Sequence, residues 1–240
     1  MGCYGVQLLE RKAWPDGQPM TWVKCPKCNI EWNRLIANGI CWDCDDKDRR
    51  EFAQKKAIEE RFKAIFGSVK AMNYYTFGKF KQTEENREAY EAARNFNSQK
   101  DNLYLWGPCG TGKSHLSYAT AKMYAMNGKS VVISTPLKMV DSFRTKNDME
   151  KESRFQEYTE CDLLLIDDLG ISKYTDFGLE ILCEVLNRRT LQMRNGLMVT
   201  SNLSMRDLAS KNDDRLASRL TGLCRIIAII GTDYRLQGRE

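Results

Sequence analysis

Residues 102–116 read NLYLWGPCGTGKSHL, and this stretch decides the fold of the chain. Residues 107–114 fit the spacing G-x-x-x-x-G-K-S, in which glycines let backbone N–H groups turn toward a phosphate. A short apolar run precedes this loop as a predicted strand, and residues 114–126 follow it as a predicted helix without a breaker. The N-terminus of that helix, the positive end of its dipole, would also attract the phosphate. The sequence therefore predicts a nucleotide-binding loop, and a glycine-rich turn without a nucleotide is the alternative interpretation.

The side chains of this loop have expected partners on ATP and its magnesium ion. Lys113 supplies a positive charge for the β- and γ-phosphates, and the hydroxyl of Ser114 is offered to Mg²⁺. His115, the only histidine of the chain, is predicted to be neither a zinc ligand nor a general base. The predicted nucleotide contacts are Gly107, Pro108, Cys109, Gly110, Thr111, Gly112, Lys113, Ser114 and His115.

Length and composition limit the class of protein. The 240 residues are enough for one α/β domain of about 150 residues plus a small appendage. The formal net charge of +5 is compatible with nucleic acid without identifying it as a partner. There is no apolar run long enough to span a membrane and no signal peptide, which predicts a cytoplasmic protein. Of the nine cysteines, four have a metal-like spacing and the others are scattered, as is typical of reduced thiols.

Four cysteines near the N-terminus form the array C-x₂-C-x₁₂-C-x₂-C. Their thiolates can close tetrahedrally on Zn²⁺, and because the protein fills all positions the site would be structural and not catalytic. The segment that carries these cysteines is too short to bury a hydrophobic core. The bound metal would therefore supply the free energy of its folding. The tryptophans and lysines nearby suit either a protein partner or nucleic acid, and we favour a protein. The predicted zinc ligands are Cys25, Cys28, Cys41 and Cys44.

Hydrophobic patterning predicts the remaining architecture. Apolar runs occur at residues 103–106, 130–134, 163–166, 196–202 and 225–231. Strands separated by helical crossovers predict a five-stranded parallel sheet in a three-layer α/β fold. The charge-rich residues 45–66 carry apolar side chains at about every third or fourth position, which predicts an amphipathic helix. The predicted division is an N-terminal arm (1–24), a zinc-binding module (25–44), a helical linker (45–72) and an ATPase domain (73–240).

Two of the predicted strands end in side chains suited to ATP hydrolysis. The run LLLI at residues 163–166 leads into Asp167 and Asp168. A buried strand can deliver one carboxylate to Mg²⁺ and a second to the attacking water, so we assign Asp167 to the metal and Asp168 to the water. The strand at residues 196–202 ends in Thr-Ser-Asn, and Asn202 would hold that water or sense the γ-phosphate.

These motifs resemble those of a known group of proteins. The runs GPCGTGKSHL, LLLIDDLG, TSN and DRLASRL and the terminal YR are similar to the AAA+ ATPases of the DnaC/DnaI helicase-loader and IstB group over about residues 73–240. The resemblance implies that Arg219 is an arginine finger for the nucleotide of a neighbouring subunit, with Arg215 close by. It implies that Arg235 is a second nucleotide sensor. Only five residues follow Arg235, so we expect no separate helical lid.

The resemblance also implies a function, the ATP-dependent loading of a replicative DNA helicase onto single-stranded DNA. The zinc-binding module would dock the helicase, and subunits would assemble head to tail, so that an isolated subunit hydrolyses ATP slowly. Two segments would contact the single strand: the loop that contains Lys173 and Tyr174, and a basic segment. The alternative is that both are solvated loops without a DNA contact. The basic residues of that segment are Lys138, Arg144, Lys146, Lys151 and Arg154. The main alternative function is an IstB-like transposition accessory ATPase on duplex DNA, and a small-molecule kinase or a non-hydrolysing adaptor fits the motifs less well.

Overall fold

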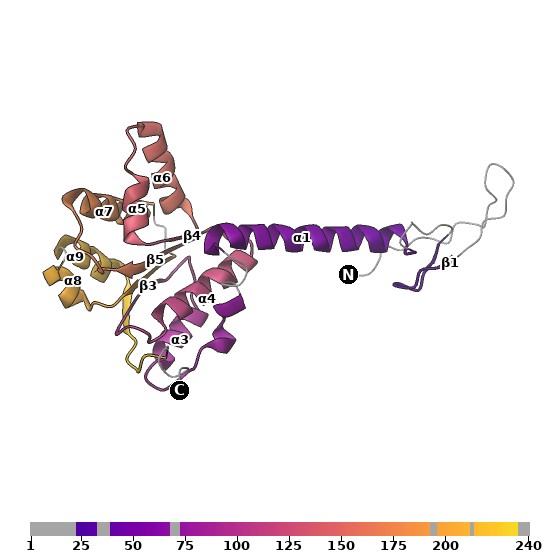
Figure 1. Cartoon of the computed structure of the whole chain (residues 1–240), viewed down its shortest axis with the longest axis horizontal. Helices are drawn as coiled ribbons and strands as arrows, with labels where there is room; N and C mark the ends of the chain where they lie inside the picture. Colours follow the sequence, from indigo (N-terminus) through magenta and orange to yellow (C-terminus); the bar gives the residue numbers. More distant parts are fainter. Residues whose placement is uncertain (1–22, 33–38, 68–72, 193–195, 212–213, 235–240) are drawn as a thin grey trace. The chain divides into compact units, whose positions relative to one another are not determined.

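The computed structural model describes residues 23–32, 39–67, 73–192, 196–211 and 214–234 of the chain. It divides into two compact units, residues 1–59 and residues 60–240. The larger unit contains a helix-covered sheet, and the smaller unit contains a small hairpin (Figure 1). The smaller unit also contains a cluster of four cysteines.

The larger unit is built on a five-stranded sheet with the strand order β4-β5-β6-β3-β7. Every neighbouring pair is parallel, which confirms the predicted sheet. The order places β6 between β3 and β5, the two strands that lead into the glycine-rich loop and the paired aspartates. The strands are β3 (Asn102–Trp106), β4 (Val131–Ser134), β5 (Leu163–Leu169), β6 (Leu197–Ser201) and β7 (Arg225–Ala228).

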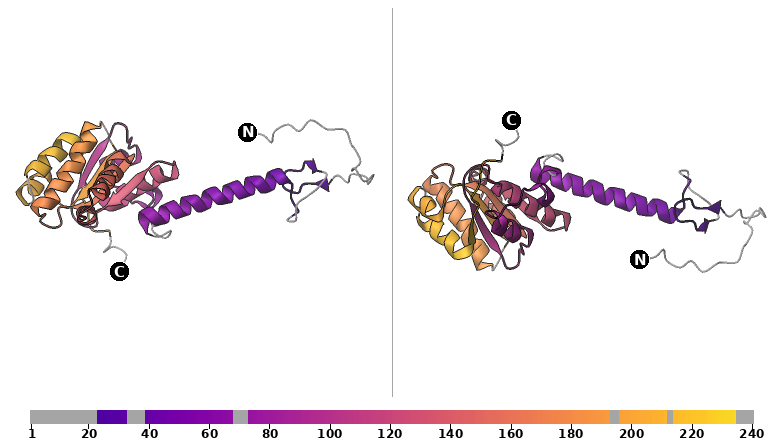
Figure 2. Two further views of the ribbon diagram at one scale, coloured as in Figure 1. Left: turned by 90° about the horizontal axis from the view of Figure 1, so that it is seen from above. Right: turned by 90° about the horizontal axis from the view of Figure 1, so that it is seen from below.

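Helices cover both faces of this sheet, so the predicted three layers are confirmed (Figures 1 and 2). One face carries α3 (Arg87–Arg94) and α4 (Lys113–Met126), preceded by the short 3₁₀ helix η1 (Phe77–Lys79). The other face carries α5 (Pro136–Ser142), α6 (Asp148–Glu160), α7 (Asp176–Leu191), α8 (Met205–Lys211) and α9 (Asp214–Leu223). The main hydrophobic core lies between the sheet and this second group of helices. Strands β3, β5 and β6 are almost entirely buried, as expected of a parallel sheet covered on both faces.

The smaller unit begins with β1 (Val23–Lys24), which pairs antiparallel with β2 (Glu31–Trp32). Helix α1 (Trp42–Phe66) starts directly after Cys41, three residues earlier than the predicted linker, so that Cys44 lies in its first turn. Asp43 and Asp45 in that turn favour the start, because carboxylates interact well with the positive end of a helix dipole. The predicted borders after residues 24, 44 and 72 stay predictions.

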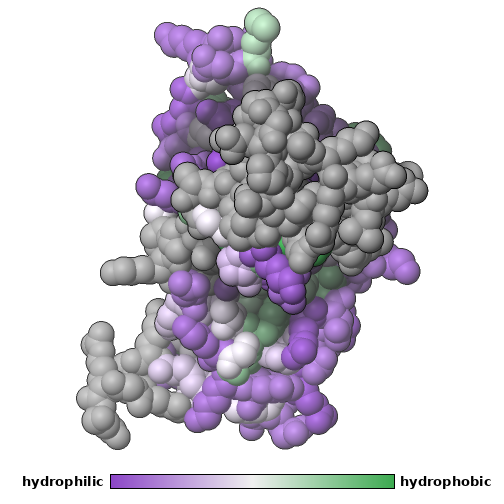
Figure 3. Space-filling model, turned by 90° about the vertical axis from the view of Figure 1, so that its right-hand side faces the viewer, coloured by the Kyte–Doolittle hydropathy of each residue, from purple (hydrophilic) through white to green (hydrophobic). Residues whose placement is uncertain are grey.

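None of the helices in the described ranges is long and apolar enough to cross a membrane. The longest, α1, is rich in charged residues, and most of the coloured surface in Figure 3 is hydrophilic. The main cluster of buried apolar side chains lies between the sheet and helices α5 to α9.

Candidate nucleotide and metal sites

The loop between β3 and α4 brings backbone closer to its surroundings than any side chain would permit. A Cβ atom at Gly107 (φ = 151°) would lie 2.1 Å from the carbonyl oxygen of Ile229. Gly112 precedes α4 with the left-handed φ of 96°, and a Cβ there would lie 2.5 Å from the ring of Phe80. Both positions therefore require glycine, which explains two of the three glycines in the predicted motif.

Lys113 is the first residue of α4 and is buried inside this loop. Its ammonium group donates hydrogen bonds to the carbonyl oxygens of Gly107 at 2.8 Å and Pro108 at 2.7 Å. The positive charge is thus held within the curve of the loop, where the sequence predicts the phosphates.

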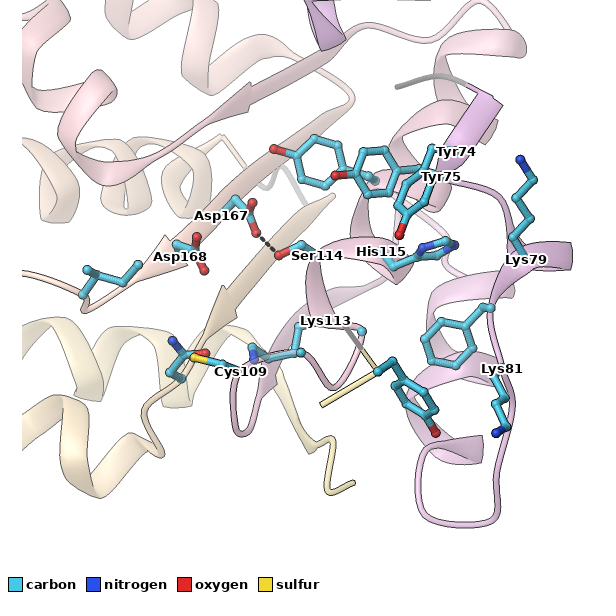
Figure 4. A pocket seen from close by; sticks show the side chains of 17 residues that line it. Tyr74, Tyr75, Lys79, Lys81, Cys109, Lys113, Ser114, His115, Asp167 and Asp168 are labelled. Atoms are coloured by element: carbon cyan, nitrogen blue, oxygen red, sulfur yellow. Dashed lines mark hydrogen bonds between the residues drawn. The ribbon is translucent and has the colours of Figure 1, made fainter. Parts of the chain in front are cut away.

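Asp167 of β5 is buried and faces the start of α4. The hydroxyl of Ser114 donates to its Oδ1 at 2.9 Å, and the hydroxyl of Thr200 donates to the same oxygen at 2.5 Å (Figure 4 marks the bond from Ser114). The two predicted Mg²⁺ ligands, Ser114 and Asp167, are therefore brought together from segments 53 residues apart. Oxygen ligands of this kind are those that Mg²⁺ prefers.

Asp168 has an unusual backbone conformation for a strand residue. Its φ is 62°, in the left-handed region, and the pairing of β5 with β6 shifts register between Ile166 and Leu169. In a regular strand, consecutive side chains point to opposite faces, but a bulge can redirect one of them. The result here is that Asp167 and Asp168 face the same cavity (Figure 4). The N–H of Asp168 donates to the hydroxyl of Thr200 at 2.9 Å, which anchors the bulge.

Thr200 therefore binds both acidic residues, and the sequence reasoning did not assign it a role. It lies at the buried end of β6, and its hydroxyl is the only group of the Thr-Ser-Asn triplet that contacts both Asp167 and Asp168 among the described hydrogen bonds. The available signal was a threonine in an otherwise apolar strand just before Asn202, but threonine is common in strands and this signal is weak.

These groups surround one cavity of about 680 Å³, within the usual range for a small-molecule site. Asn202, which follows β6, reaches it because β6 lies between β3 and β5. The predicted site residues that line it are Cys109, Gly110, Gly112, Lys113, Ser114, His115, Asp167, Asp168 and Asn202. Gly107, Pro108 and Thr111 belong to the loop but do not line this cavity, and Gly107 directly follows β3.

One wall of the cavity is aromatic. Tyr75 stacks on Tyr118 of α4 with 4.7 Å between ring centroids, and Tyr74 lies 5.6 Å from the ring of His115 (Figure 4). Nε2 of His115 is 2.8 Å from the carbonyl oxygen of Thr76, which fixes the imidazole ring. Burial raises the pKa of the Tyr118 hydroxyl, and the nearby Asp167 carboxylate raises it further. Flat, uncharged rings beside a phosphate loop suit a purine base.

Two of the arginines implied by the resemblance, Arg215 and Arg219, do not line this cavity. Arg219 lies on α9, and its Nε donates to Oδ1 of Asn187 on α7 at 2.7 Å. Arg215 lies one turn earlier, and its carbonyl oxygen is 3.5 Å from Nη1 of Arg219. Arg235 lies outside the described residues. Its neighbour Tyr234 lines the cavity, and the N–H of Tyr234 donates to the carbonyl oxygen of Gly110 at 3.2 Å.

The basic segment is partly neutralised by its own acidic residues. Ion pairs join Arg144 to Asp141, Lys151 to Asp148 and Arg154 to Glu157, at 3.0, 3.1 and 2.8 Å. Lys138, Lys146 and Lys173 are exposed. Tyr174, by contrast, is half-buried against the core, and its hydroxyl accepts the N–H of Gly170 at 2.6 Å. This bond ties the loop after β5, so Tyr174 has a local structural contact that the sequence did not predict.

The four predicted zinc ligands form one cluster in the smaller unit, and their sulfur atoms all lie within 4.8 Å of one another. The Cys25–Cys44 and Cys28–Cys41 sulfurs are 4.0 and 3.7 Å apart. Sulfurs at the corners of a tetrahedron with Zn–S bonds of about 2.3 Å are about 3.8 Å apart, so this arrangement fits zinc.

Local backbone explains how distant cysteines meet. Cys25 follows β1, and the N–H of Cys41 donates to its sulfur at 3.4 Å, just before α1 begins. Burial by itself would raise the pKa of the Cys25 thiol. Hydrogen bonds from backbone N–H groups, led by that of Cys41, together outweigh burial and lower the pKa to about 6. Burial and the neighbouring thiols raise the pKa of Cys44. Binding a cation would favour ionisation of all the thiols, since metal-bound cysteine is a thiolate.

Comparison with known proteins relates this arrangement to a family. The model of the family described as "IstB-like ATP binding protein" matches residues 44–240. The replicative helicase loader DnaC of Buchnera aphidicola subsp. Baizongia pistaciae is 31% identical over 134 residues, which are 54% of each chain. The chain thus matches about half the length of this curated relative.

Solved structures share the fold of the larger unit. The crystal structure of the DnaC helicase loader superposes with a TM-score of 0.57 and 20% identity, covering 68% of this chain and 100% of that one. AMPPCP-bound DnaA from Aquifex aeolicus gives a TM-score of 0.60 and 24% identity, covering 65% of this chain and 50% of that one. The predicted AAA+ type of P-loop fold is therefore confirmed.

Proposed function

The chain belongs to the IstB-like ATP-binding protein family, and we propose that it binds ATP to control the loading of a replicative DNA helicase. The observation that carries the nucleotide half of this proposal is the cavity in which Lys113, Ser114 and Asp167 meet. The similarity to a relative named replicative helicase loader supports the other half.

ATP would lie with its phosphates in the loop and its base against the aromatic wall. Backbone N–H groups of residues 107–114 and the N-terminus of α4 would bind the phosphate oxygens. The ammonium group of Lys113, which is held by loop carbonyls, would turn to the β- and γ-phosphates. The rings of Tyr75, Tyr118 and His115 would then pack on the base.

Ser114 and Asp167 would hold Mg²⁺, since their side-chain oxygens already lie 2.9 Å apart beside the loop. Bound Mg²⁺ would neutralise charge on the β- and γ-phosphates. Asp168 would accept a proton from the attacking water or orient it, and Asn202 would hold the same water from the neighbouring strand. The bulge in β5 supports this role, because it turns Asp168 into the cavity beside Asp167.

Arg219 would act on the cavity of a neighbouring subunit and not on its own. It does not line its own cavity, and among the described residues no carboxylate forms an ion pair with it. An arginine supplied in trans accelerates phosphoryl transfer by about 10³–10⁵ in other systems. Hydrolysis would therefore depend on a head-to-tail assembly, and an isolated subunit would be slow.

The smaller unit would bind zinc and contact the helicase. Trp42, next to Cys41, keeps 61% of its surface exposed, and Phe52 on the same helix keeps 70%. Large exposed apolar side chains on a small metal-stabilised unit favour a protein partner. Single-stranded DNA would contact the larger unit through Lys138, Lys146 and Lys173, the exposed members of the predicted basic set that form no ion pair with another described residue, unlike Arg144 and Arg154.

Mixing two inactive variants tests the trans arrangement. Lys113→Ala removes nucleotide binding but keeps the finger, whereas Arg219→Ala keeps the site but removes the finger. Each variant alone should hydrolyse ATP slowly, and their mixture should recover part of the wild-type rate. Recovery absent over a range of mixing ratios would contradict hydrolysis between subunits.

A loading assay tests the cellular role. The replicative helicase of the source organism is mixed with circular single-stranded DNA and this chain, and unwinding of an annealed oligonucleotide is measured. We expect ATP and wild-type chain to raise unwinding, and Lys113→Ala to fail. If the chain has no effect but forms ATP-dependent filaments on duplex DNA, the transposition accessory function replaces the loader.

A further inference from the structure

The side chain of Arg219 is held at two of its three nitrogen atoms. Its Nε donates to Oδ1 of Asn187 at 2.7 Å, and its Nη1 is 3.5 Å from the carbonyl oxygen of Arg215 and 3.8 Å from the sulfur of Cys183. Its Nη2 has no hydrogen-bond acceptor within the described ranges of the chain. A guanidinium group is a planar fork of five N–H donors. Contacts at Nε and Nη1 therefore restrict the orientation of the group and leave Nη2 to meet another acceptor.

Other arginines of the larger unit are bound differently. Arg188 donates to Glu184 and Glu152 at 2.8 Å, so its charge is compensated. Arg189, two positions after Asn187, is buried and donates to backbone carbonyl groups. The partners of Arg219 are an amide, a backbone carbonyl and a cysteine sulfur, and none of them is a carboxylate. Arg219 is thus oriented without being neutralised, as an anion-binding group requires.

The position of Asn187 suits a tether. It lies on α7, which packs against α9, and both helices belong to the face of the sheet that carries the main core. Its side chain is half-buried, and the oxygen that faces Arg219 comes from a short side chain with little freedom. Neither residue lines the nucleotide cavity of its own chain, so a change at Asn187 leaves that cavity untouched.

We propose that Asn187 is a positioning residue that holds Arg219 so that its Nη2 edge meets the γ-phosphate bound by the next subunit. This inference rests on the proposed role of Arg219 as the arginine finger. A long, flexible side chain that is already oriented loses less freedom when it reaches the transition state. Loss of one such hydrogen bond should slow assembly-dependent hydrolysis about tenfold.

The test compares full-length Asn187→Ala with wild type, Arg219→Ala, and the double variant that carries both changes. Steady-state ATP hydrolysis is measured over a range of protein concentrations, and the affinity for a fluorescent ATP analogue is measured separately. Asn187→Gln, which keeps a neutral amide acceptor, and Asn127→Ala, an exposed change outside the site, are the controls. Thermal unfolding checks that every variant is folded.

We expect Asn187→Ala to lower the maximal rate about tenfold with unchanged affinity for the analogue, and Asn187→Gln, whose amide can still accept from Arg219, to retain more activity. In the Arg219→Ala background the same change should have no further effect, because the group that it positions is gone. Asn187→Ala subunits should recover activity with Lys113→Ala subunits, which supply an intact finger, but not with Arg219→Ala subunits.

Three results would overturn the inference: a wild-type rate for Asn187→Ala, an equal further loss in the Arg219→Ala background, or weakened binding of the analogue. A separate result tests the finger itself. If Arg219→Ala hydrolyses ATP at the wild-type rate, the proposed trans arrangement is wrong, whereas a slow Arg219→Ala beside a normal Asn187→Ala refutes only the tether.

Discussion

Replacing Thr200 with valine tests the geometry of the acidic end of the cavity. Thr200 is fully buried, and its hydroxyl donates to Oδ1 of Asp167 at 2.5 Å and accepts the N–H of Asp168 at 2.9 Å. Valine differs from threonine by one methyl in place of the hydroxyl, so the change removes both hydrogen bonds without leaving a cavity.

The magnitude follows from these two bonds. A hydrogen bond to a charged group contributes about 1.5–3 kcal/mol, and a buried N–H left without an acceptor costs about 1–3 kcal/mol. We expect Thr200→Val to lower the free energy of unfolding by about 3 kcal/mol. Hydrolysis should slow by about tenfold to a hundredfold, because Asp167 and Asp168 lose their shared anchor, while ATP affinity should change by less than about threefold.

A buried threonine away from the cavity provides the matched control. The hydroxyl of Thr120 on α4 donates to the carbonyl oxygens of Ala93 at 2.9 Å and Leu116 at 3.1 Å. Thr120→Val should also lose stability but should keep the wild-type turnover number. Urea denaturation, steady-state hydrolysis and binding of a fluorescent ATP analogue measure the three quantities. A wild-type turnover number in Thr200→Val, or an equal loss in Thr120→Val, would show that Thr200 does not hold the two carboxylates for hydrolysis.

Three further predictions follow from single contacts. Cys109 is exposed and lines the cavity, so ATP should slow its alkylation by N-ethylmaleimide, and equal rates with and without ATP would place the nucleotide elsewhere. Gly107→Ala should abolish binding of a fluorescent ATP analogue, because its Cβ would lie 2.1 Å from the carbonyl oxygen of Ile229; retained affinity would contradict the close approach of these two segments. Arg189→Met should lower the free energy of unfolding by about 3 kcal/mol or more, since several buried carbonyls lose their donor, and an unchanged urea midpoint would refute this.

Local patterns were sufficient to predict the loop, the sheet and the cysteine cluster. The spacing of glycines around Lys113 depends on backbone geometry within eight residues, and the buried strands appear as short apolar runs. The cluster of four thiols was predicted from spacing alone, because two C-x-x-C pairs together supply the four ligands of one tetrahedral metal site. In each case the information lies within a few residues along the chain.

Features that depend on neighbouring strands were not predictable in this way. The left-handed φ of Asp168 and the bulge in β5 arise from its pairing with β6, and a single segment does not reveal that pairing. The role of Thr200 requires the strand order β5-β6, and the tether between Asn187 and Arg219 requires the packing of α7 on α9. Lys173 and Tyr174 were predicted as a DNA contact because a cation beside an aromatic ring suits the backbone and bases of a single strand. The bond from the N–H of Gly170 to the Tyr174 hydroxyl could not be read from that pairing.

Co-purification of the chain with the replicative helicase of its source organism, in ATP and in ADP, is the decisive test of the proposed loader function. A loader should form a complex that depends on the zinc site, so that Cys28→Ser loses the helicase while its larger unit still binds a fluorescent ATP analogue. The complex with the intact chain should also differ in stability between ATP and ADP. A helicase that never binds the intact chain in either nucleotide would contradict the loader function.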